Sequence, residues 1–360
     1  MIVRLHADAR SIPLPDGSVH AVVTSPPYFG LRKYAGVEPS AWGGDPAWLG
    51  CLGNEPTVDL YVAHLVEVFR EVRRVLRSDG TLWLNLGDSY ATGGRGTYRN
   101  PGSDVEPIEH GGKQAYTREY ARQQPNRMPI PGLKPKDLVG IPWLVAFALR
   151  ADGWWLRSEI IWAKPNPMPE SVADRPTKAH ETIFLLTKSA KYAYDADAIR
   201  EPAEWARWGD QTVVKPQQGT AGWIGNKTKA ELEKRRTTDK QRGHSRRHAG
   251  FNDRWDAMDK AEQGANGRNA RSVWTIATEP YPEAHFATFP TELPRRCILA
   301  GCPEGGTVLD PFLGSGTTAQ VAKSLGRKAI GIELNPEYLA LAVRRNEQMA
   351  LMMEVANRTE

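Results

Sequence analysis

Strand and helix signals alternate along most of this chain, and that alternation restricts the folds it can adopt. Short apolar runs predict seven strands, at residues 2–7, 19–24, 81–86, 155–162, 181–186, 307–310 and 328–333. Amphipathic spacing predicts helices at residues 59–76, 137–151, 317–325 and 336–345, and the Asp79-Gly80 turn is expected to end the first of them. Apolar strands separated by helices are typical of a parallel sheet covered on both faces. We therefore expect a doubly wound α/β fold of about seven strands, with ligands bound beyond the carboxyl ends of the strands.

A glycine-rich turn near the C-terminus predicts a nucleoside ligand. The run Thr307-Val-Leu-Asp-Pro-Phe-Leu-Gly-Ser-Gly-Thr-Thr reads as a strand, a tight turn and the start of a helix. Gly314 and Gly316 let the backbone approach a ligand closely. The next predicted strand ends in Glu333, 23 residues after Asp310, where an acid can bind the hydroxyls of a ribose. The third glycine of the dinucleotide fingerprint and the Gly-Lys-Ser/Thr of a P-loop are absent from this run, so NAD and ATP fit poorly and a smaller cofactor is indicated.

A second turn, in the first half of the chain, is suited to a planar amine. The predicted strand 19–24 runs into Ser25-Pro26-Pro27-Tyr28. The two prolines remove two amide donors and fix the backbone, which leaves nearby carbonyls as rigid acceptors. With the Ser25 hydroxyl beside them and the Tyr28 ring available for stacking, the turn can hold the exocyclic amine of a nucleobase. The competing interpretation is a strand end followed by a core aromatic side chain.

Basic side chains gather in one segment, residues 200–271. It holds 16 Lys and Arg against 10 Asp and Glu, a net charge of +6, while the whole chain carries +5. Aromatic side chains lie among them, a mixture that suits contact with phosphates and base edges: Trp205, Trp208, Trp223, Phe251 and Trp255. A solvated insert is the competing interpretation. A second loop, residues 89–136, has 8 basic against 4 acidic side chains and could touch the same polyanion.

Other features argue against a membrane protein and a metalloprotein. The longest uncharged apolar run has 12 residues, 138–149, whereas a membrane helix needs about 20. The N-terminus lacks the apolar core of a signal peptide. Three cysteines without Cys-x-x-Cys spacing predict neither a disulfide framework nor a zinc site. We expect no metal, no membrane contact and a location in the cytoplasm.

The two turns together resemble the motifs of one family. Ser25-Pro26-Pro27-Tyr28, joined to Asp310-Pro-Phe-Leu-Gly-Ser-Gly and Ile330-Gly-Ile-Glu-Leu-Asn, is similar to the DNA amino-methyltransferases that use S-adenosylmethionine, in the group where the catalytic motif precedes the cofactor motif. The resemblance covers nearly the whole chain. It implies a Rossmann-like sheet and direct methyl transfer, without a covalent enzyme intermediate, to the amine of a base flipped out of double-stranded DNA.

The resemblance also implies roles for individual residues and regions. The target amine would be held by Ser25, Pro26, Pro27 and Tyr28. S-adenosylmethionine would be held by Asp8, Phe289, Asp310, Phe312, Gly314, Gly316, Thr317, Thr318 and Glu333. The catalytic half would span residues 1–195 with a mobile loop at 89–136, the inserted target recognition region residues 196–275, and the cofactor-binding half residues 276–360. DNA contacts are expected from Arg235, Arg236, Arg242, Arg246 and Arg247.

The predicted methylated atom is N4 of cytosine, with N6 of adenine as the alternative. In this family a serine at the first motif position is associated with cytosine, and an Asp or Asn with adenine, so Ser25 points to cytosine. Methylation of RNA or of a protein amide, and a non-catalytic nucleic-acid-binding module, are the competing interpretations. The expected partner is duplex DNA, a cognate restriction endonuclease is a candidate second partner, and the expected state is a monomer or a homodimer.

Overall fold

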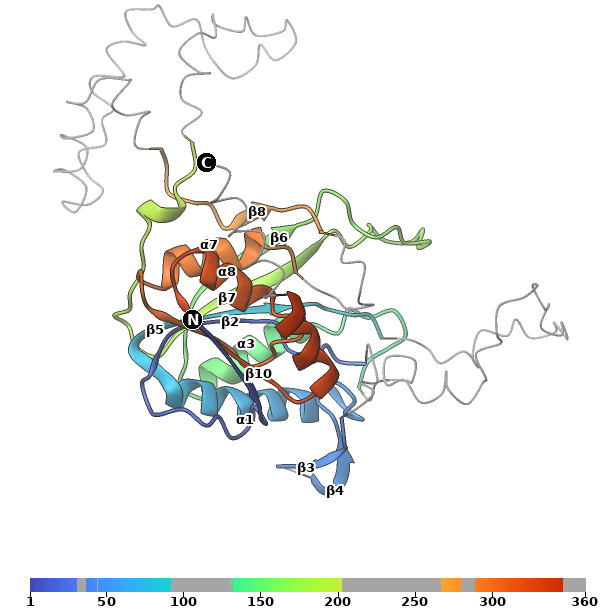
Figure 1. Ribbon diagram of the computed structural model, residues 1–360. Coiled ribbons are helices and arrows are strands. Elements are labelled where there is room, and N and C mark those ends of the chain that lie inside the picture. Colours follow the sequence, from blue (N-terminus) through green and yellow to red (C-terminus); the bar gives the residue numbers. More distant parts are fainter. Residues whose placement is uncertain are drawn as a thin grey trace, which may run out of the picture. The chain divides into compact units, whose positions relative to one another are not determined.

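One eight-stranded sheet organises the protein (Figure 1). The structure is a computed structural model that describes residues 1–30, 37–43, 45–91, 130, 132–202, 267–279 and 289–345. Across the sheet, the strands are β1 (Ile2–His6), β10 (Lys328–Glu333), β9 (Thr307–Asp310), β2 (Val19–Thr24), β5 (Leu76–Leu86), β7 (His180–Thr187), β6 (Trp155–Ala163) and β8 (Val273–Thr275). β7 is antiparallel to both neighbours, and the other neighbouring pairs are parallel. The two ends of the chain are therefore interleaved, with the C-terminal strands β9 and β10 between β2 and β1.

Helices cover both faces of this sheet, which confirms the doubly wound α/β prediction. α1 (Val58–Val75) and α3 (Ile141–Ala151) pack against each other on one face. α7 (Glu292–Gly301) and α8 (Thr317–Ser324) pack against each other and against the strands on the other face (Figure 1). Residues 336–345 form a further helix after β10.

The amphipathic pattern of α1 places its apolar side chains in the core. The Thr57 side chain caps the helix by accepting a hydrogen bond from the amide of Leu60, at 3.2 Å. Leu65, Phe69 and Val72 are fully buried at helical spacing. The sheet below is covered on both faces, so residues 80–86 of its central strand β5 are all buried, without alternation between a buried and an exposed face.

Four local features differ from the sequence-based expectation. The predicted helix at 137–151 begins instead at Ile141, because Asp88 Oδ1, beyond the end of β5, accepts hydrogen bonds from the amides of Gly140 (3.0 Å) and Ile141 (3.1 Å). The Asp79-Gly80 turn does not end a helix; it lies in an irregularity of β5, between the pairs Val19–Leu76 and Ala21–Thr81.

Short strands account for the other two differences. The hairpin of β3 (Ser40–Trp42) and β4 (Asp45–Gly50) was not predicted, since its glycine- and proline-rich sequence lacks strand character. β8, at the end of the predicted insert, extends the central sheet by pairing with β6.

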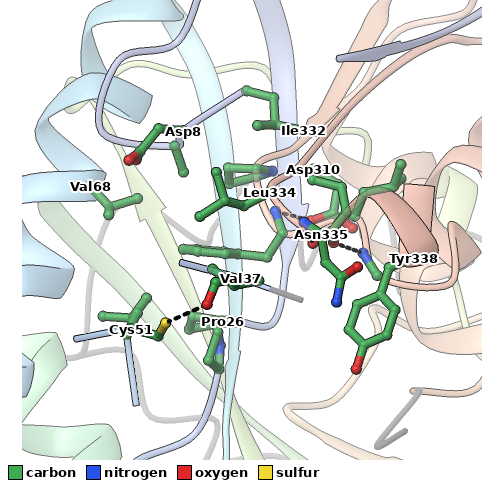
Figure 2. Close-up of a pocket in the computed structure, with 18 of the residues that line it drawn as sticks. Asp8, Pro26, Val37, Cys51, Val68, Asp310, Ile332, Leu334, Asn335 and Tyr338 are labelled. Carbon is green, nitrogen blue, oxygen red and sulfur yellow. Dashed lines mark hydrogen bonds between the residues drawn. The ribbon is translucent and has the colours of Figure 1, made fainter. Parts of the chain in front are cut away.

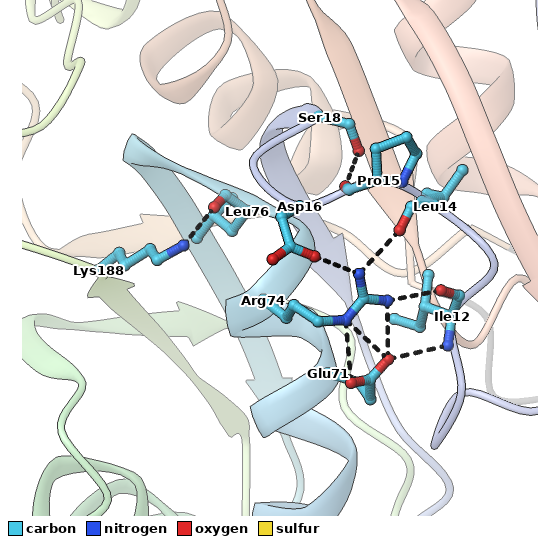
Figure 3. A network of polar contacts seen from close by, with 9 residues as sticks. All are labelled: Ile12, Leu14, Pro15, Asp16, Ser18, Glu71, Arg74, Leu76 and Lys188. Atoms are coloured by element: carbon cyan, nitrogen blue, oxygen red, sulfur yellow. Dashed lines mark hydrogen bonds and ion pairs between the residues drawn. The ribbon is translucent and has the colours of Figure 1, made fainter.

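Arg74 of α1 anchors the connection between β1 and β2 (Figure 3). Its guanidinium donates to the carbonyls of Ile12 (2.7 Å) and Leu14 (2.9 Å) and pairs with Asp16 at 2.6 Å. Glu71, one helical turn earlier, pairs with Arg74 and accepts from the amide of Ile12 at 3.2 Å. Since this connection begins directly after β1, the network also restrains the residues that follow that strand.

The chain divides into two compact units, Met1–Ala198 with Arg271–Glu360, and Ile199–Ala270. The sheet and its helices belong to the first unit. Within the described ranges, no helix is long and apolar enough to cross a membrane. The same ranges hold no cluster of His, Cys, Asp and Glu side chains that could bind a metal ion.

Two leucines of α3 provide a matched test of this packing. Leu149 is fully buried, whereas Leu144 on the same helix is 41% exposed. We expect Leu149→Ala to lower the free energy of unfolding by about 2–5 kcal/mol, because it leaves a cavity in the core. Leu144→Ala should lower it by about 1 kcal/mol or less. Urea denaturation of both variants checks this, and equal losses would contradict the assigned orientation of α3.

Candidate active site

A cavity lies at the carboxyl ends of the parallel strands, where residues from both halves of the chain meet (Figure 2). Asp8 follows β1, residues 25–28 follow β2, residues 310–315 continue from β9, and residues 333–335 end β10; all of them line the cavity. The segment around β3 and β4 contributes Ser40, Trp42 and Cys51 to the lining. This location is the one that a doubly wound parallel sheet predicts for a ligand.

The glycine turn after β9 has the backbone conformation that the sequence indicates. Gly314 and Gly316 have positive φ angles of 50° and 80°, and Gly316 is the N-cap of α8. The amide of Leu313 donates to the carbonyl of Ile332 at 2.9 Å, which joins the turn to β10. Arg345, in the helix after β10, donates to the hydroxyl of Ser315 at 2.9 Å. The turn is thus held from both sides.

Two carboxyl groups lie beside this turn, Asp310 buried and Glu333 half-buried. Asp310, 3% exposed, accepts hydrogen bonds from the Thr24 hydroxyl (2.7 Å) and the amide of Phe312 (3.1 Å). Burial raises the pKa of Asp310 to about 6, and these hydrogen bonds only partly oppose it. Burial also raises the pKa of Glu333, whose oxygens accept from the amides of Gly314 (2.8 Å) and Asn335 (2.9 Å).

The charge of the lining discriminates between classes of ligand. Four carboxyl groups line the cavity, from Asp8, Glu38, Asp310 and Glu333, whereas no Lys, Arg or His of the described residues lines it. Such a lining attracts a cation and repels phosphate groups. The cavity therefore fits a positively charged nucleoside better than a nucleotide.

Asp8 is held by Arg10 rather than left free in the cavity. The guanidinium pairs with the Asp8 carboxylate at 2.6 Å, donates to the Ser40 hydroxyl at 3.0 Å and lies over the Trp42 ring. Burial raises the pKa of Asp8, but the hydrogen bonds and charge of Arg10 outweigh it, so the pKa is lowered overall. Arg10 thereby connects Asp8 to the β3–β4 hairpin, a link that sequence reasoning missed because the residues are far apart in the chain.

The Ser-Pro-Pro-Tyr turn follows β2, and its two proline carbonyls differ in their partners among the described residues. The Tyr61 hydroxyl of α1 donates to the Pro27 carbonyl at 2.7 Å, so this acceptor is occupied. Within the described part of the chain, the Pro26 carbonyl accepts no hydrogen bond. The Tyr28 ring lines the cavity, and Gly87 leaves room for it, since a Cβ at Gly87 would lie 2.5 Å from Tyr28 Cε2. The sequence predicted several fixed acceptors here; among the described residues, Pro27 O is occupied by Tyr61 and Pro26 O accepts no hydrogen bond.

Beside the turn lies a half-buried polar network that sequence reasoning did not find. The Tyr28 hydroxyl donates to Glu181 Oε2 at 2.7 Å, and Glu181 Oε1 pairs with Lys164 at 2.5 Å. Asn85, in β5, donates its amide hydrogens to the Tyr28 hydroxyl (2.9 Å) and to Glu181 Oε2 (2.8 Å). A single Asn between Leu84 and Leu86 in an apolar strand was the available signal.

Most of the predicted cofactor residues line the cavity: Asp8, Phe289, Asp310, Phe312, Gly314, Thr317 and Glu333. Two do not. Gly316 caps α8, and Thr318 donates to the carbonyl of Val23 at 3.2 Å and hydrogen-bonds Asp310, so it supports the site from behind. Asn335 and Tyr338 line the cavity but were not predicted. The five arginines predicted to contact DNA, from Arg235 to Arg247, lie outside the described residues, as does most of the loop at 89–136.

The sequence of this chain is similar to those of known DNA methyltransferases. The family model for DNA methylases, which groups N6 and N4 methyltransferases, matches residues 19–344. The type II methyltransferase M.SmaI of Serratia marcescens is 44% identical over 325 residues, 90% of this chain and 82% of that protein.

Two solved structures have a similar fold. The PvuII DNA methyltransferase, described as cytosine-N4-specific, has a TM-score of 0.54 at 16% identity over 95% of this chain and 85% of that one. A putative DNA modification methylase from Thermus thermophilus, in complex with S-adenosyl-L-methionine, has a TM-score of 0.51 at 22% identity over 97% of this chain and 94% of that one. At these identities the likeness concerns the fold.

The raised pKa of Asp310 predicts a pH-dependent cost in stability. Below its unfolded value of 3.8, both states hold the proton; between 3.8 and about 6, only the folded state does; above about 6, both are ionised and the burial cost is complete. The wild type should therefore lose stability as pH rises from 4 to 7, and Asp310→Asn should not. The free energy of unfolding of the variant relative to the wild type should rise by roughly 3 kcal/mol over this range. Urea denaturation across this range measures the difference. A difference that does not change with pH would show that Asp310 ionises normally in the folded state.

Proposed function

Because this chain belongs to the DNA methylase family, we propose that it transfers the methyl group of S-adenosylmethionine to N4 of a cytosine in double-stranded DNA. Family membership carries the coarser statement: the protein is a DNA amino-methyltransferase. The assignment to cytosine N4 rests on Ser25. This residue lines the cavity beside Pro26, whose carbonyl accepts no hydrogen bond from the described residues.

The cavity suits S-adenosylmethionine as the methyl donor. The bound donor supplies an electrophilic methyl group and carries a positive sulfonium. The lining would favour this positive charge, because it contains four carboxyl groups and no cationic side chain of the described residues. Glu333 would accept from the ribose hydroxyls, since each carboxylate oxygen retains acceptor capacity beyond the one amide it already binds. Phe312 and Ile332 offer apolar surface to the adenine.

The turn after β2 would orient the target amine. An exocyclic NH2 group has two hydrogens, and Ser25 Oγ and Pro26 O are two neighbouring acceptors for them. Holding both hydrogens turns the nitrogen lone pair toward the methyl donor, which increases its nucleophilicity and fixes the in-line geometry. The Tyr28 ring, held against Gly87, offers a face on which the flipped base can stack.

Cytosine is favoured over adenine because the acceptor at the first position is a hydroxyl. Ser25 has a short side chain that both donates and accepts, so it can approach the N4 and N3 edge of a pyrimidine. An acid at the same position would reach further and suit a purine amine. Adenine N6 is the alternative product, and the identity of the methylated nucleoside distinguishes the two.

The basic segment would read the DNA. We assign target recognition to residues 196–275, with the catalytic half at 1–195 and the cofactor half at 276–360. The net charge of +6 between residues 200 and 271 supports this assignment. A cognate restriction endonuclease is the candidate partner, since the relative at 44% identity is named a type II methyltransferase.

Nucleoside analysis tests the proposed product. After incubation with S-adenosylmethionine and duplex DNA, enzymatic digestion and mass spectrometry should detect N4-methylcytosine. Ser25→Ala should slow its formation by about 100-fold. Ser18→Ala, which removes a hydroxyl at the opposite end of β2, is the matched control and should retain the wild-type rate. N6-methyladenine without N4-methylcytosine would overturn the assigned base, and no methylated nucleoside would overturn the proposed function.

Salt dependence tests the assignment of the basic segment. Replacing Arg242, Arg246 and Arg247 together by Gln should reduce the slope of log K for DNA against log salt by about 0.9 for each phosphate that these side chains neutralise. Arg70→Gln is the control, because Arg70 is an exposed arginine of α1 that pairs with Asp152. Fluorescence anisotropy at several salt concentrations gives both slopes. An unchanged slope in the triple variant would place the arginine run away from DNA.

A further inference from the structure

A series of hydrogen bonds leads from the cavity to the half-buried carboxylate of Glu181. Ser25 Oγ, in the lining, lies 3.2 Å from the Tyr28 hydroxyl, and that hydroxyl lies 2.7 Å from Glu181 Oε2. Glu181 is the second residue of β7, so the chain runs from the end of β2 to another strand of the same sheet. Lys164, directly after β6, is the last member of the series and pairs with the other Glu181 oxygen.

The hydroxyl hydrogens of Ser25 and Tyr28 can point in only one direction along this series of hydrogen bonds. An ionised carboxylate has no hydrogen to donate, so Tyr28 must donate to Glu181. The two amide hydrogens of Asn85 go to its two shorter contacts, Tyr28 and Glu181, and its distance to Ser25 Oγ is 3.5 Å. The Ser25 hydrogen therefore points to the Tyr28 oxygen, and the lone pairs of Ser25 remain available to a group in the cavity.

The hydroxyls of Ser25 and Tyr28 are suited to passing a proton rather than storing it. Burial and the charge of Glu181 raise the pKa of Tyr28 well above its ordinary value, so the phenol stays protonated and can release one hydrogen only as it gains another. One oxygen of Glu181 pairs with Lys164, and the other accepts hydrogen bonds from Tyr28 and Asn85.

We propose that Glu181 is the terminal acceptor of the proton that the target amine loses on methylation, reached through Ser25 and Tyr28. The inference rests on the proposed amine methylation. The amine nitrogen forms a bond to the methyl carbon, and the carbon–sulfur bond breaks with its electron pair left on sulfur. The nitrogen then passes one proton to Ser25 Oγ, Ser25 passes its own to the Tyr28 oxygen, and Tyr28 passes its own to Glu181 Oε2. Glu181 ends as a neutral acid and returns the proton to solvent after product release.

A purely structural role of the same groups predicts a different set of results. Tyr61 also supports the turn with a hydroxyl, but it donates to the Pro27 carbonyl and lies outside the chain from Ser25 to Glu181. Tyr61→Phe therefore removes a supporting hydrogen bond without interrupting the proton path. Tyr28→Phe and Glu181→Gln interrupt the path while conserving the shape of each side chain.

The test is single-turnover methyl transfer with labelled S-adenosylmethionine and duplex DNA, in H2O and in D2O. We expect a slower wild-type reaction in D2O, and a loss of rate of about 100-fold or more in Tyr28→Phe and in Glu181→Gln. Calorimetry should give both variants the wild-type affinity for the cofactor, which shows that they are folded. Tyr61→Phe should lose far less rate and keep the wild-type solvent isotope effect.

Two results would overturn the inference: wild-type rates in both path variants, or a wild-type reaction with the same rate in H2O and D2O. Failure of the proposed function would look different, because the wild-type protein would then transfer no label to DNA in either solvent.

Discussion

The buried hydrogen bond from the Thr24 hydroxyl to Asp310 joins two parts of the chain that lie 286 residues apart. It connects the ends of β2 and β9, which are neighbours in the sheet. The Ser-Pro-Pro-Tyr turn begins one residue after Thr24, and the glycine turn begins directly after Asp310. Because both strands are parallel, the two turns leave the sheet at the same edge. In the proposed function, the position of the target amine relative to the cofactor would depend on this contact between strands.

The electrostatics of the site follow from the same arrangement. Carboxyl groups at the ends of several strands converge on one cavity, where burial raises the pKa of Asp310 and Glu333. A cation bound beside these groups would offset the cost of ionising them. The nearby cationic side chains lie outside the cavity lining. Arg10 connects Asp8 to the β3–β4 hairpin, and Lys164 pairs with Glu181. A cavity of this kind selects a charged nucleoside by attraction and excludes phosphates by repulsion.

Much of this fold could be predicted from local patterns, and the remainder depended on contacts between distant residues. The seven predicted strands all lie in the central sheet, because apolar runs report burial directly. The start of α3 was misplaced since its cap, Asp88, lies just beyond β5. The glycine turn and the proline turn were identified as motifs. Asn85, Glu181 and Lys164 were not, because nothing in their local sequence indicates that the sheet brings them together under Tyr28.

The central claim is that the carboxylate-lined cavity binds S-adenosylmethionine and no phosphate-bearing nucleotide. Isothermal titration calorimetry with S-adenosylmethionine, in the absence and presence of millimolar ATP or NAD, tests it most directly. We predict a Kd in about the micromolar range that neither nucleotide changes. Displacement of S-adenosylmethionine by ATP or NAD at comparable affinity would contradict this claim, as would the absence of any binding.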